Sequence, residues 1–162
     1  MKKIIIYLTV ILVIVDQAIK LLITNSLTSY TGIVVIKNFF YITYIENDGA
    51  AFNLFSGSRW LLVALGILVI IALVRSIIMD KKVTKLDVIS YSLVLSGIIG
   101  NLIDRIINGK VIDYLDFYIY NYDAPIFNFA DICIVIGAIT IIYSLIIEDD
   151  INENNNSRSR IK

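Results

Sequence analysis

Four long apolar stretches limit what this chain can fold into. They lie near Ile4–Ile23, Trp60–Met79, Leu86–Ile107 and Phe127–Ile147. A helix of about 20 apolar residues crosses roughly 30 Å of hydrocarbon at 1.5 Å per residue. Of the 162 residues, 58% are hydrophobic, which is more than an ordinary soluble domain carries. We therefore predict a membrane α-helical protein with four transmembrane helices.

The first stretch is too long for the apolar part of a cleavable signal peptide, and it contains Asp16 and Lys20. We therefore treat residues 1–151 as one domain. Residues 152–162 are rich in Asn, Ser and Arg. This composition predicts a disordered tail, because it offers little apolar surface to bury.

Basic residues next to the spans predict how the helices are oriented, since cytoplasmic connections carry more Lys and Arg. They gather before the first span, between the second and third spans, and after the fourth. These residues are Lys2, Lys3, Lys81, Lys82, Lys85, Arg158, Arg160 and Lys162. Both termini are therefore expected to be cytoplasmic, with the longer connections 24–59 and 108–126 on the outer side.

The outer connections are not predicted to be plain loops. Gly32–Ile45 is dominated by β-branched and aromatic residues, and Lys37-Asn38 within it suits the turn of a hairpin. Ile112–Tyr120 also has the composition of an extended segment. We predict a small β-sheet, rich in Tyr and Phe, at the outer membrane surface. Anchoring by aromatic side chains alone is the alternative.

Polar residues of the spans are expected at one depth. Counted at about 1.5 Å per residue, they fall in the outer leaflet. The set comprises Asp16, Asn101, Asp104, Asp113, Asn128 and Asp131. A path for ions or protons would need such groups staggered through the membrane. A single level instead favours a site open to the outer leaflet, although polar groups also hold membrane helices together by hydrogen bonds.

Helical spacing supports this grouping. Gly97, Asn101 and Asp104 share one face of the third span, because they lie at i, i+4 and i+7. Asn128 and Asp131 are three apart on the fourth span. Asp16 and Lys20, four apart on the first, form a possible ion pair.

Two carboxylates that lie close together in a site shielded from water suggest an aspartic catalytic pair. Asp113 comes shortly after the third span and Asp131 lies near the start of the fourth, so both are expected at the same edge of two neighbouring spans. The chain has no His. The absence of His argues against a His-assisted nucleophile and most zinc sites, so we expect no metal and no cofactor. The zero net charge gives no reason to expect a nucleic-acid partner.

Other classes remain possible. A serine protease with a Lys base would need a Ser partner for Lys20, and a Mg²⁺ enzyme would usually need more basic residues for phosphate. The strongest alternative outside enzymes is a small transporter or assembly factor that uses Asp16, Asp104 and Asp131 as contacts within the membrane.

Five motifs in order resemble those of the lipoprotein signal peptidase family, also called type II signal peptidases. They cover nearly all of the chain apart from the tail. The motifs are Asp16-Gln17-Ala18-Ile19-Lys20, Asn47-Asp48-Gly49-Ala50-Ala51-Phe52, Gly100-Asn101-Leu102-Ile103-Asp104-Arg105, Val111-Ile112-Asp113-Tyr114 and Phe127-Asn128-Phe129-Ala130-Asp131.

The resemblance implies a multi-pass protein of the bacterial cytoplasmic (plasma) membrane whose small extracytoplasmic β-sheet cradles the substrate. It implies an intramembrane aspartic endopeptidase that cleaves prolipoproteins just before a diacylglyceryl-modified Cys. Asp113 and Asp131 match the family's catalytic pair. Membrane lipid and the inhibitor globomycin, a cyclic lipopeptide, are the other implied partners.

Eight further motif residues are expected to bind substrate or orient the site: Asp16, Lys20, Asn47, Gly49, Asn101, Asp104, Arg105 and Asn128. Asn101 and Asn128 can both donate and accept hydrogen bonds, and Arg105 offers a fixed fork of donors. Asp104 is better suited to an ion pair or to orienting the site than to proton transfer. Asn47 and Gly49 belong to a predicted turn. Sequence alone does not tell which of Asp113 and Asp131 holds the proton, because the two titrate as a pair.

Overall fold

The structure, a computed structural model, describes residues 1–50, 54–80, 82–119 and 122–160. Ala51 and Phe52 of the second motif, and Tyr120 at the end of the third predicted strand, lie outside the described residues. The elements follow the order α1 (Lys2–Ser26), β1 (Gly32–Ile36), β2 (Phe40–Asn47), α2 (Arg59–Met79), α3 (Lys85–Asn108), β3 (Val111–Ile119), β4 (Tyr122–Asp123) and α4 (Phe129–Arg160).

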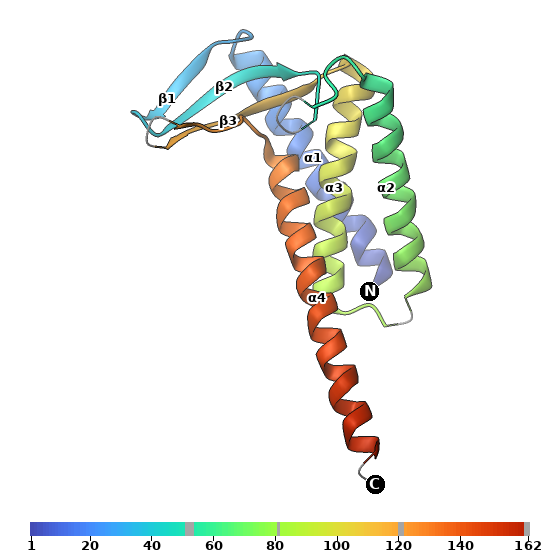
Figure 1. Cartoon of the computed structure of the whole chain (residues 1–162). Helices are drawn as coiled ribbons and strands as arrows, with labels where there is room; N and C mark the ends of the chain where they lie inside the picture. Colours follow the sequence, from blue (N-terminus) through green and yellow to red (C-terminus); the bar gives the residue numbers. More distant parts are fainter. Residues whose placement is uncertain (51–53, 81, 120–121, 161–162) are drawn as a thin grey trace.

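Four helices form an upright bundle with a β-sheet at one end (Figure 1). Helix α3 packs against each of the other three helices, whereas α2 and α4 lie on opposite sides of it. Both termini lie at the end of the bundle away from the sheet. All four helices are long and apolar enough to span a membrane. The prediction of four transmembrane helices is therefore confirmed.

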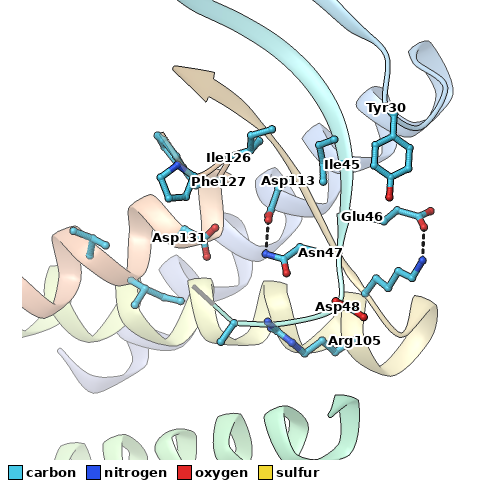
Figure 2. A pocket seen from close by; sticks show the side chains of 15 residues that line it. Tyr30, Ile45, Glu46, Asn47, Asp48, Arg105, Asp113, Ile126, Phe127 and Asp131 are labelled. Atoms are coloured by element: carbon cyan, nitrogen blue, oxygen red, sulfur yellow. Dashed lines mark hydrogen bonds and ion pairs between the residues drawn. The ribbon is translucent and has the colours of Figure 1, made fainter. Parts of the chain in front are cut away.

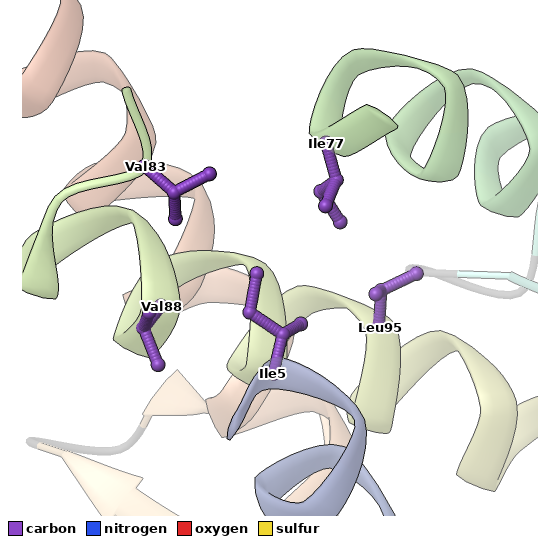
Figure 3. Packing of buried hydrophobic residues seen from close by; sticks show 5 residues of the cluster. All are labelled: Ile5, Ile77, Val83, Val88 and Leu95. Carbon is purple, nitrogen blue, oxygen red and sulfur yellow. The ribbon is translucent and has the colours of Figure 1, made fainter. Parts of the chain in front are cut away.

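The outward faces of the bundle are apolar, as lipid contact requires. In the most apolar window of α3, 50% of the residues are buried, against 17–22% in the other three helices. At the end away from the sheet, one cluster of buried side chains joins three helices (Figure 3). Its members are Ile5 of α1, Ile77 of α2, Val83, and Val88 and Leu95 of α3.

Helix α3 begins where its sequence favours a helix start. The Thr84 side chain accepts a hydrogen bond from the Asp87 backbone N–H, and the Asp87 carboxylate accepts one from the Thr84 N–H. This reciprocal pair is a capping box, which satisfies donors that the first turn leaves free.

Two glycines let α3 approach its neighbours closely. A Cβ at Gly97 would meet the carbonyl oxygen of Ala130 on α4, and one at Gly100 would meet the Asp16 carboxylate on α1. Any larger residue would push these helices apart, since the contacts are closer than a side chain allows. The face predicted for Gly97, Asn101 and Asp104 is indeed the buried face of α3.

The strands form an antiparallel sheet in the order β1-β2-β3-β4. The predicted hairpin turn lies between β1 and β2, where Asn38 has a positive φ of 61° that asparagine tolerates. Aromatic rings cross the sheet: Phe117 stacks on Phe40 at 4.5 Å and on Phe127 at 5.7 Å between ring centroids. The predicted small sheet rich in aromatic residues is therefore confirmed.

Helix α4 differs from the predicted fourth span at both of its ends. The helix begins at Phe129, so the placement of Asn128 inside the fourth span was wrong. Asn128 precedes the helix as its N-cap. Its side-chain oxygen accepts a hydrogen bond from the Asp131 N–H, which the first turn of the helix leaves without a partner. At the other end α4 continues to Arg160. The disorder predicted from residue 152 onward stays a prediction.

Candidate active site

Asp113 and Asp131 line the same pocket, which lies between the sheet and the adjoining ends of α3 and α4 and has a volume of about 830 Å³. We call it the sheet-side pocket. Asp113 comes from β3 and Asp131 from the first turn of α4, and both carboxyl groups point into the pocket (Figure 2). The expected convergence of these two carboxylates from separate elements is thus present.

Asp113 is held by two amide side chains. Asn47 Nδ2 donates to its Oδ2 at 2.9 Å, and Asn128 Nδ2 donates to its Oδ1 at 2.6 Å. Asp113 is 2% exposed and Asn128 is fully buried. Both carboxylate oxygens are therefore fixed in direction by donors that have little freedom to move.

Asp131 is part of the cap of α4. Asn128 Oδ1 accepts a hydrogen bond from the Asp131 backbone N–H at 3.0 Å, and Asp131 Oδ2 accepts one from the Asn128 N–H at 3.1 Å. Asn101 Nδ2 donates to the other oxygen of Asp131 at 2.7 Å. Negative charge at this position is stabilised by these donors and by the positive end of the helix dipole.

Burial raises the pKa of the Asp113 carboxyl from its usual 3.8 to about 6. The negative charge of Asp131 raises it further, while hydrogen bonds from Asn47 and Asn128 and the charge of Lys20 oppose the rise. A carboxyl that exchanges its proton near pH 6 can act as an acid under mild conditions.

A buried ion cluster lies behind the two aspartates. The Lys20 ammonium contacts the carboxylates of Asp16 at 2.9 Å and Asp104 at 2.7 Å. Its third acceptor is Asn101 Oδ1 at 3.1 Å. Lys20 is only 1% exposed, so its three N–H donors are all matched in the absence of water. The predicted pair of Asp16 and Lys20 is present, and Asp104 pairs with Lys20.

Asn101 links this ion cluster to the aspartates. Its Oδ1 accepts from both Lys20 and Asn128, and its Nδ2 donates to Asp131. An amide with both ends engaged cannot rotate without breaking hydrogen bonds, so the cluster sets the direction in which Asn101 donates.

Arg105 fixes the chain after β2. Its Nη2 donates to the Gly49 carbonyl at 2.7 Å, and its Nη1 to the Asn101 carbonyl at 3.4 Å. The Gly49 N–H in turn donates to Asn47 Oδ1 at 2.9 Å, which forms the predicted turn. Arg105 Nε is buried without a hydrogen-bond partner among the described residues.

All ten residues singled out from the sequence lie in one connected hydrogen-bond network. They are Asp16, Lys20, Asn47, Gly49, Asn101, Asp104, Arg105, Asp113, Asn128 and Asp131.

Two further residues of the site were not predicted. Gln17 Nε2 lies within hydrogen-bond distance of Asp16, Asp104 and the Gly100 carbonyl. The Tyr114 hydroxyl accepts from the Phe129 N–H at 3.1 Å and so positions the start of α4. The spacing of Gln17 to Lys20, i to i+3, places both on one helix face and could have indicated the first.

No group of three or more His, Cys, Asp or Glu side chains suited to a metal ion occurs in the described part of the chain. Asp16 and Asp104 are two acidic residues close to each other, and the Lys20 ammonium occupies the space between them. The expectation of a site that works without a metal or cofactor stays a prediction.

Comparison with known proteins agrees with the motifs. The family model described as signal peptidase (SPase) II matches residues 8–147. A lipoprotein signal peptidase from Clostridium acetobutylicum is 41% identical over 143 residues, covering 85% of this chain and 90% of that protein. One from Staphylococcus aureus is 38% identical over 141 residues, covering 87% of this chain and 86% of that protein.

Solved structures share the architecture. A bacterial membrane enzyme solved at 2.3 Å resolution has a TM-score of 0.83 and 36% identity, covering 90% of this chain and 88% of that one. A second, at 1.9 Å resolution, has a TM-score of 0.78 and 38% identity, covering 87% of this chain and 91% of that one.

Proposed function

The chain belongs to the signal peptidase II family, a family of membrane peptidases that remove signal peptides from lipoproteins, and from this premise we propose that it is an aspartic endopeptidase. Asp113 and Asp131 are the proposed catalytic pair, and the substrate is a precursor carrying a diacylglyceryl group on its Cys. The bond cleaved is the peptide bond on the amino side of that Cys.

One observation carries the proposal. Two carboxyl groups from different elements line one pocket, and the same buried amide, Asn128, contacts both residues. A pair of carboxyl groups that shares one proton can activate water and polarise a carbonyl at the same time. A role in helix packing alone would not require both groups to open into a cavity of this size.

The environments of the two aspartates support different roles. Asp113 is the more buried and holds its proton to about pH 6. Asp131 lies in the first turn of α4, where negative charge is stabilised. In the proposed reaction Asp131 takes a proton from water, whose oxygen attacks the peptide carbonyl carbon. Asp113 gives its proton to the carbonyl oxygen.

The products follow by return of these protons. The tetrahedral diol collapses, its C–N bond breaks, and the nitrogen of the lipid-modified Cys receives the proton held by Asp131. Asp113 regains its proton from the diol hydroxyl as the new carboxyl group forms. Each carboxyl group therefore ends in the state in which it began, and no other co-reactant is needed.

We propose that the site works at the outer leaflet, with both termini in the cytoplasm. The termini lie at the opposite end of the bundle from the sheet, where the basic residues gather. A scissile bond at this depth needs an apolar anchor on each side. The signal-peptide helix is one anchor, and the diacylglyceryl group, held among lipid, is the other. Globomycin would compete with substrate for the sheet-side pocket.

The experiment that tests the catalytic pair compares three conservative variants. Asp113→Asn and Asp131→Asn should each abolish cleavage of a lipid-modified precursor by the purified protein. Asp116→Asn is the matched control: it lies on the same strand, is also buried, and bonds to Thr43 away from the pocket. Folding of each variant is checked by thermal unfolding in detergent. Near-normal cleavage by a folded Asp113→Asn or Asp131→Asn protein would refute the assignment.

A second experiment tests the role of the lipid. The same precursor is incubated with the protein before and after diacylglyceryl transfer to its Cys. The lipid-modified form should be cleaved much faster, because its acyl chains hold the scissile bond at the depth of Asp113 and Asp131. Equal rates would show that lipid does not position the bond.

A further inference from the structure

The sheet-side pocket has two walls of opposite character. One is lined by apolar residues of α4 and of the segment before it: Pro125, Ile126, Phe127, Ile134 and Val135. The other is lined by Tyr30, Glu46, Asp48 and Lys110, and we call it the charged wall. In Figure 2, Tyr30 and Glu46 lie on one side of Asp113. Ile126 and Phe127 lie on the other side. The catalytic mechanism proposed above makes no use of the charged wall.

The two walls face different surroundings. Val135 is 57% exposed and belongs to a helix that can span a membrane, so its exposed surface meets lipid. The side chains of Lys110 and Glu46 are 47% and 37% exposed and lie outside the spans. Charged groups stay exposed where water can solvate them. The charged wall is therefore the side of the pocket that opens to water.

The ionic groups of the charged wall are held in place. Lys110 Nζ contacts Glu46 Oε2 at 2.9 Å, and the Tyr44 hydroxyl donates to Glu46 Oε1 at 3.0 Å. The hydrogen bond from Lys110 lowers the pKa of Glu46 below its usual range. Glu46 thus presents a fixed negative charge to the pocket at neutral pH.

Tyr30 is held at this wall in an unusual backbone conformation. Its φ is 65°, in the left-handed region that bulky residues rarely adopt. Its N–H donates to the Tyr44 carbonyl at 2.8 Å, which fixes the residue to β2. Tyr30 is nevertheless 74% exposed, so little of its ring packs against the described residues. Residues strained in this way cluster at sites that bind ligands.

The charged wall lies within one or two residues of the proposed catalytic pair. Glu46 faces Ile112 in the register of β2 and β3, and Ile112 directly precedes Asp113. Glu46 is also next to Asn47, which donates to Asp113. An extended peptide advances about 3.3 Å per residue. A chain bound at Asp113 therefore reaches the charged wall with its next one or two residues.

We propose that the charged wall binds the first residues of the precursor that follow the lipid-modified Cys, and that it disfavours an acidic residue there. The inference rests on the proposed function and adds a determinant of substrate choice on the mature side of the scissile bond. The mature chain must leave the pocket toward water, which is the direction that the charged wall faces. The acyl chains and the signal peptide are apolar and suit the opposite wall.

The balance of charges sets the preference. Glu46 and Asp48 carry two negative charges and Lys110 carries one positive charge, so one negative charge is in excess. Nearer the reacting bond, Arg105 and Asp131 add one charge of each sign. Complementary charges favour the right partner, and like charges suppress the wrong one. A basic residue after the Cys should therefore bind better than an acidic one.

The test measures kcat/KM for lipid-modified precursors that differ only in the residue after the Cys, which is Lys, Gln or Glu. For the wild-type protein the value for the Lys form should exceed that for the Glu form about fivefold, the upper range for an exposed charge pair. Glu46→Lys should reverse this preference, and Lys110→Glu should strengthen it. Both variants break the same ion pair, so damage to the wall alone would move the preference in one direction in both.

Lys37→Glu is the matched control. Lys37 is exposed in the turn between β1 and β2 and does not line the pocket. The variant changes the total charge as much as Lys110→Glu does, yet should keep the wild-type preference. An equal preference in wild type, Glu46→Lys and Lys110→Glu would overturn the inference. So would an equal effect of Lys37→Glu and Lys110→Glu, because the preference would then not come from the wall.

Crosslinking gives a readout that does not depend on activity. A benzophenone-bearing phenylalanine replaces Tyr30 or, on the apolar wall, Val135, with Asp131→Asn present to keep the precursor intact. Position 30 should crosslink to residues after the Cys, and position 135 to the acyl chains or to residues before the Cys. Crosslinks from position 30 to the signal peptide would overturn the inference, while cleavage of the Gln form by the wild-type protein would still uphold the proposed function. Failure of the wild-type protein to cleave any of these precursors would refute that function and the inference with it.

Discussion

Replacing Asn128 by alanine removes the amide that contacts both aspartates. The Asn128 side chain donates to Asp113 at 2.6 Å and accepts from the Asp131 N–H at 3.0 Å. Asn128 is fully buried and Asp113 is 2% exposed. Water therefore cannot easily replace the lost donor without a rearrangement of the site.

The expected size of the effect follows from that contact. A hydrogen bond to a charged group contributes about 1.5–3 kcal/mol, and one pKa unit corresponds to about 1.4 kcal/mol. Asn128 favours the ionised form of Asp113 and so lowers its pKa. Its removal should raise the pKa of Asp113 from about 6 by about 1–2 units.

The assay is the pH dependence of kcat/KM for a lipid-modified precursor, which reports the ionisation of the free enzyme. In the proposed reaction Asp113 must be protonated, so the rate falls as pH rises through its pKa. In Asn128→Ala this alkaline limb should move upward by about 1–2 pH units. The maximum should also fall at least about tenfold, because Asp131 loses part of its support.

Asn108→Ala is the control, since Asn108 is an exposed residue at the end of α3 that does not line the sheet-side pocket. It should leave the profile in place. An alkaline limb that stays fixed or moves downward in a folded Asn128→Ala protein would show that Asp113 is not the proton donor. If Asp113 and Asp131 titrate together as a pair, the alkaline limb should still move upward, because the Asn128 hydrogen bond stabilises the ionised form of Asp113.

Three other perturbations test the support around the site. Lys20→Met should destabilise the protein by about 3–5 kcal/mol, measured by unfolding in detergent, because it leaves two buried carboxylates unpaired. Lys110→Met, which breaks an exposed ion pair, should leave the stability nearly unchanged, and equal losses in the two variants would contradict this reasoning. Gly100→Ala should lower the stability by about 1–3 kcal/mol and should also lower the activity, because the new methyl group meets the Asp16 carboxylate. Unchanged unfolding and cleavage would show that α1 and α3 can separate at no cost. Cleavage should survive EDTA, and a loss reversed by added Mg²⁺ or Zn²⁺ would replace the aspartic mechanism with a metal-dependent one.

Features within a single element could be predicted from the sequence. Apolar length identified the four spans, and β-branched and aromatic composition identified the sheet. The spacing of Gly97, Asn101 and Asp104 identified the buried face of α3. The period of a helix is a local property of the backbone, so the sequence is enough to say which side chains share a face.

The relations between elements required the tertiary structure. The sequence placed Asp104 beside Arg105, yet the structure pairs it with Lys20 of another helix, because Arg105 turns to the Gly49 carbonyl. Asn128 was expected within the fourth span and instead caps α4. The pKa of Asp113 depends on burial by segments distant in the sequence.

The features that the sequence predicts and those that only the tertiary structure shows differ for a physical reason. Residue type and spacing determined that this chain spans a membrane and that its carboxylates lie near one depth, because both follow from the length and period of each helix. Only the packing of α1, α3, α4 and β3 decided which carboxylates share a pocket and which is paired with Lys20. Those contacts depend on how separate segments approach each other, which Gly97 and Gly100 permit but do not specify.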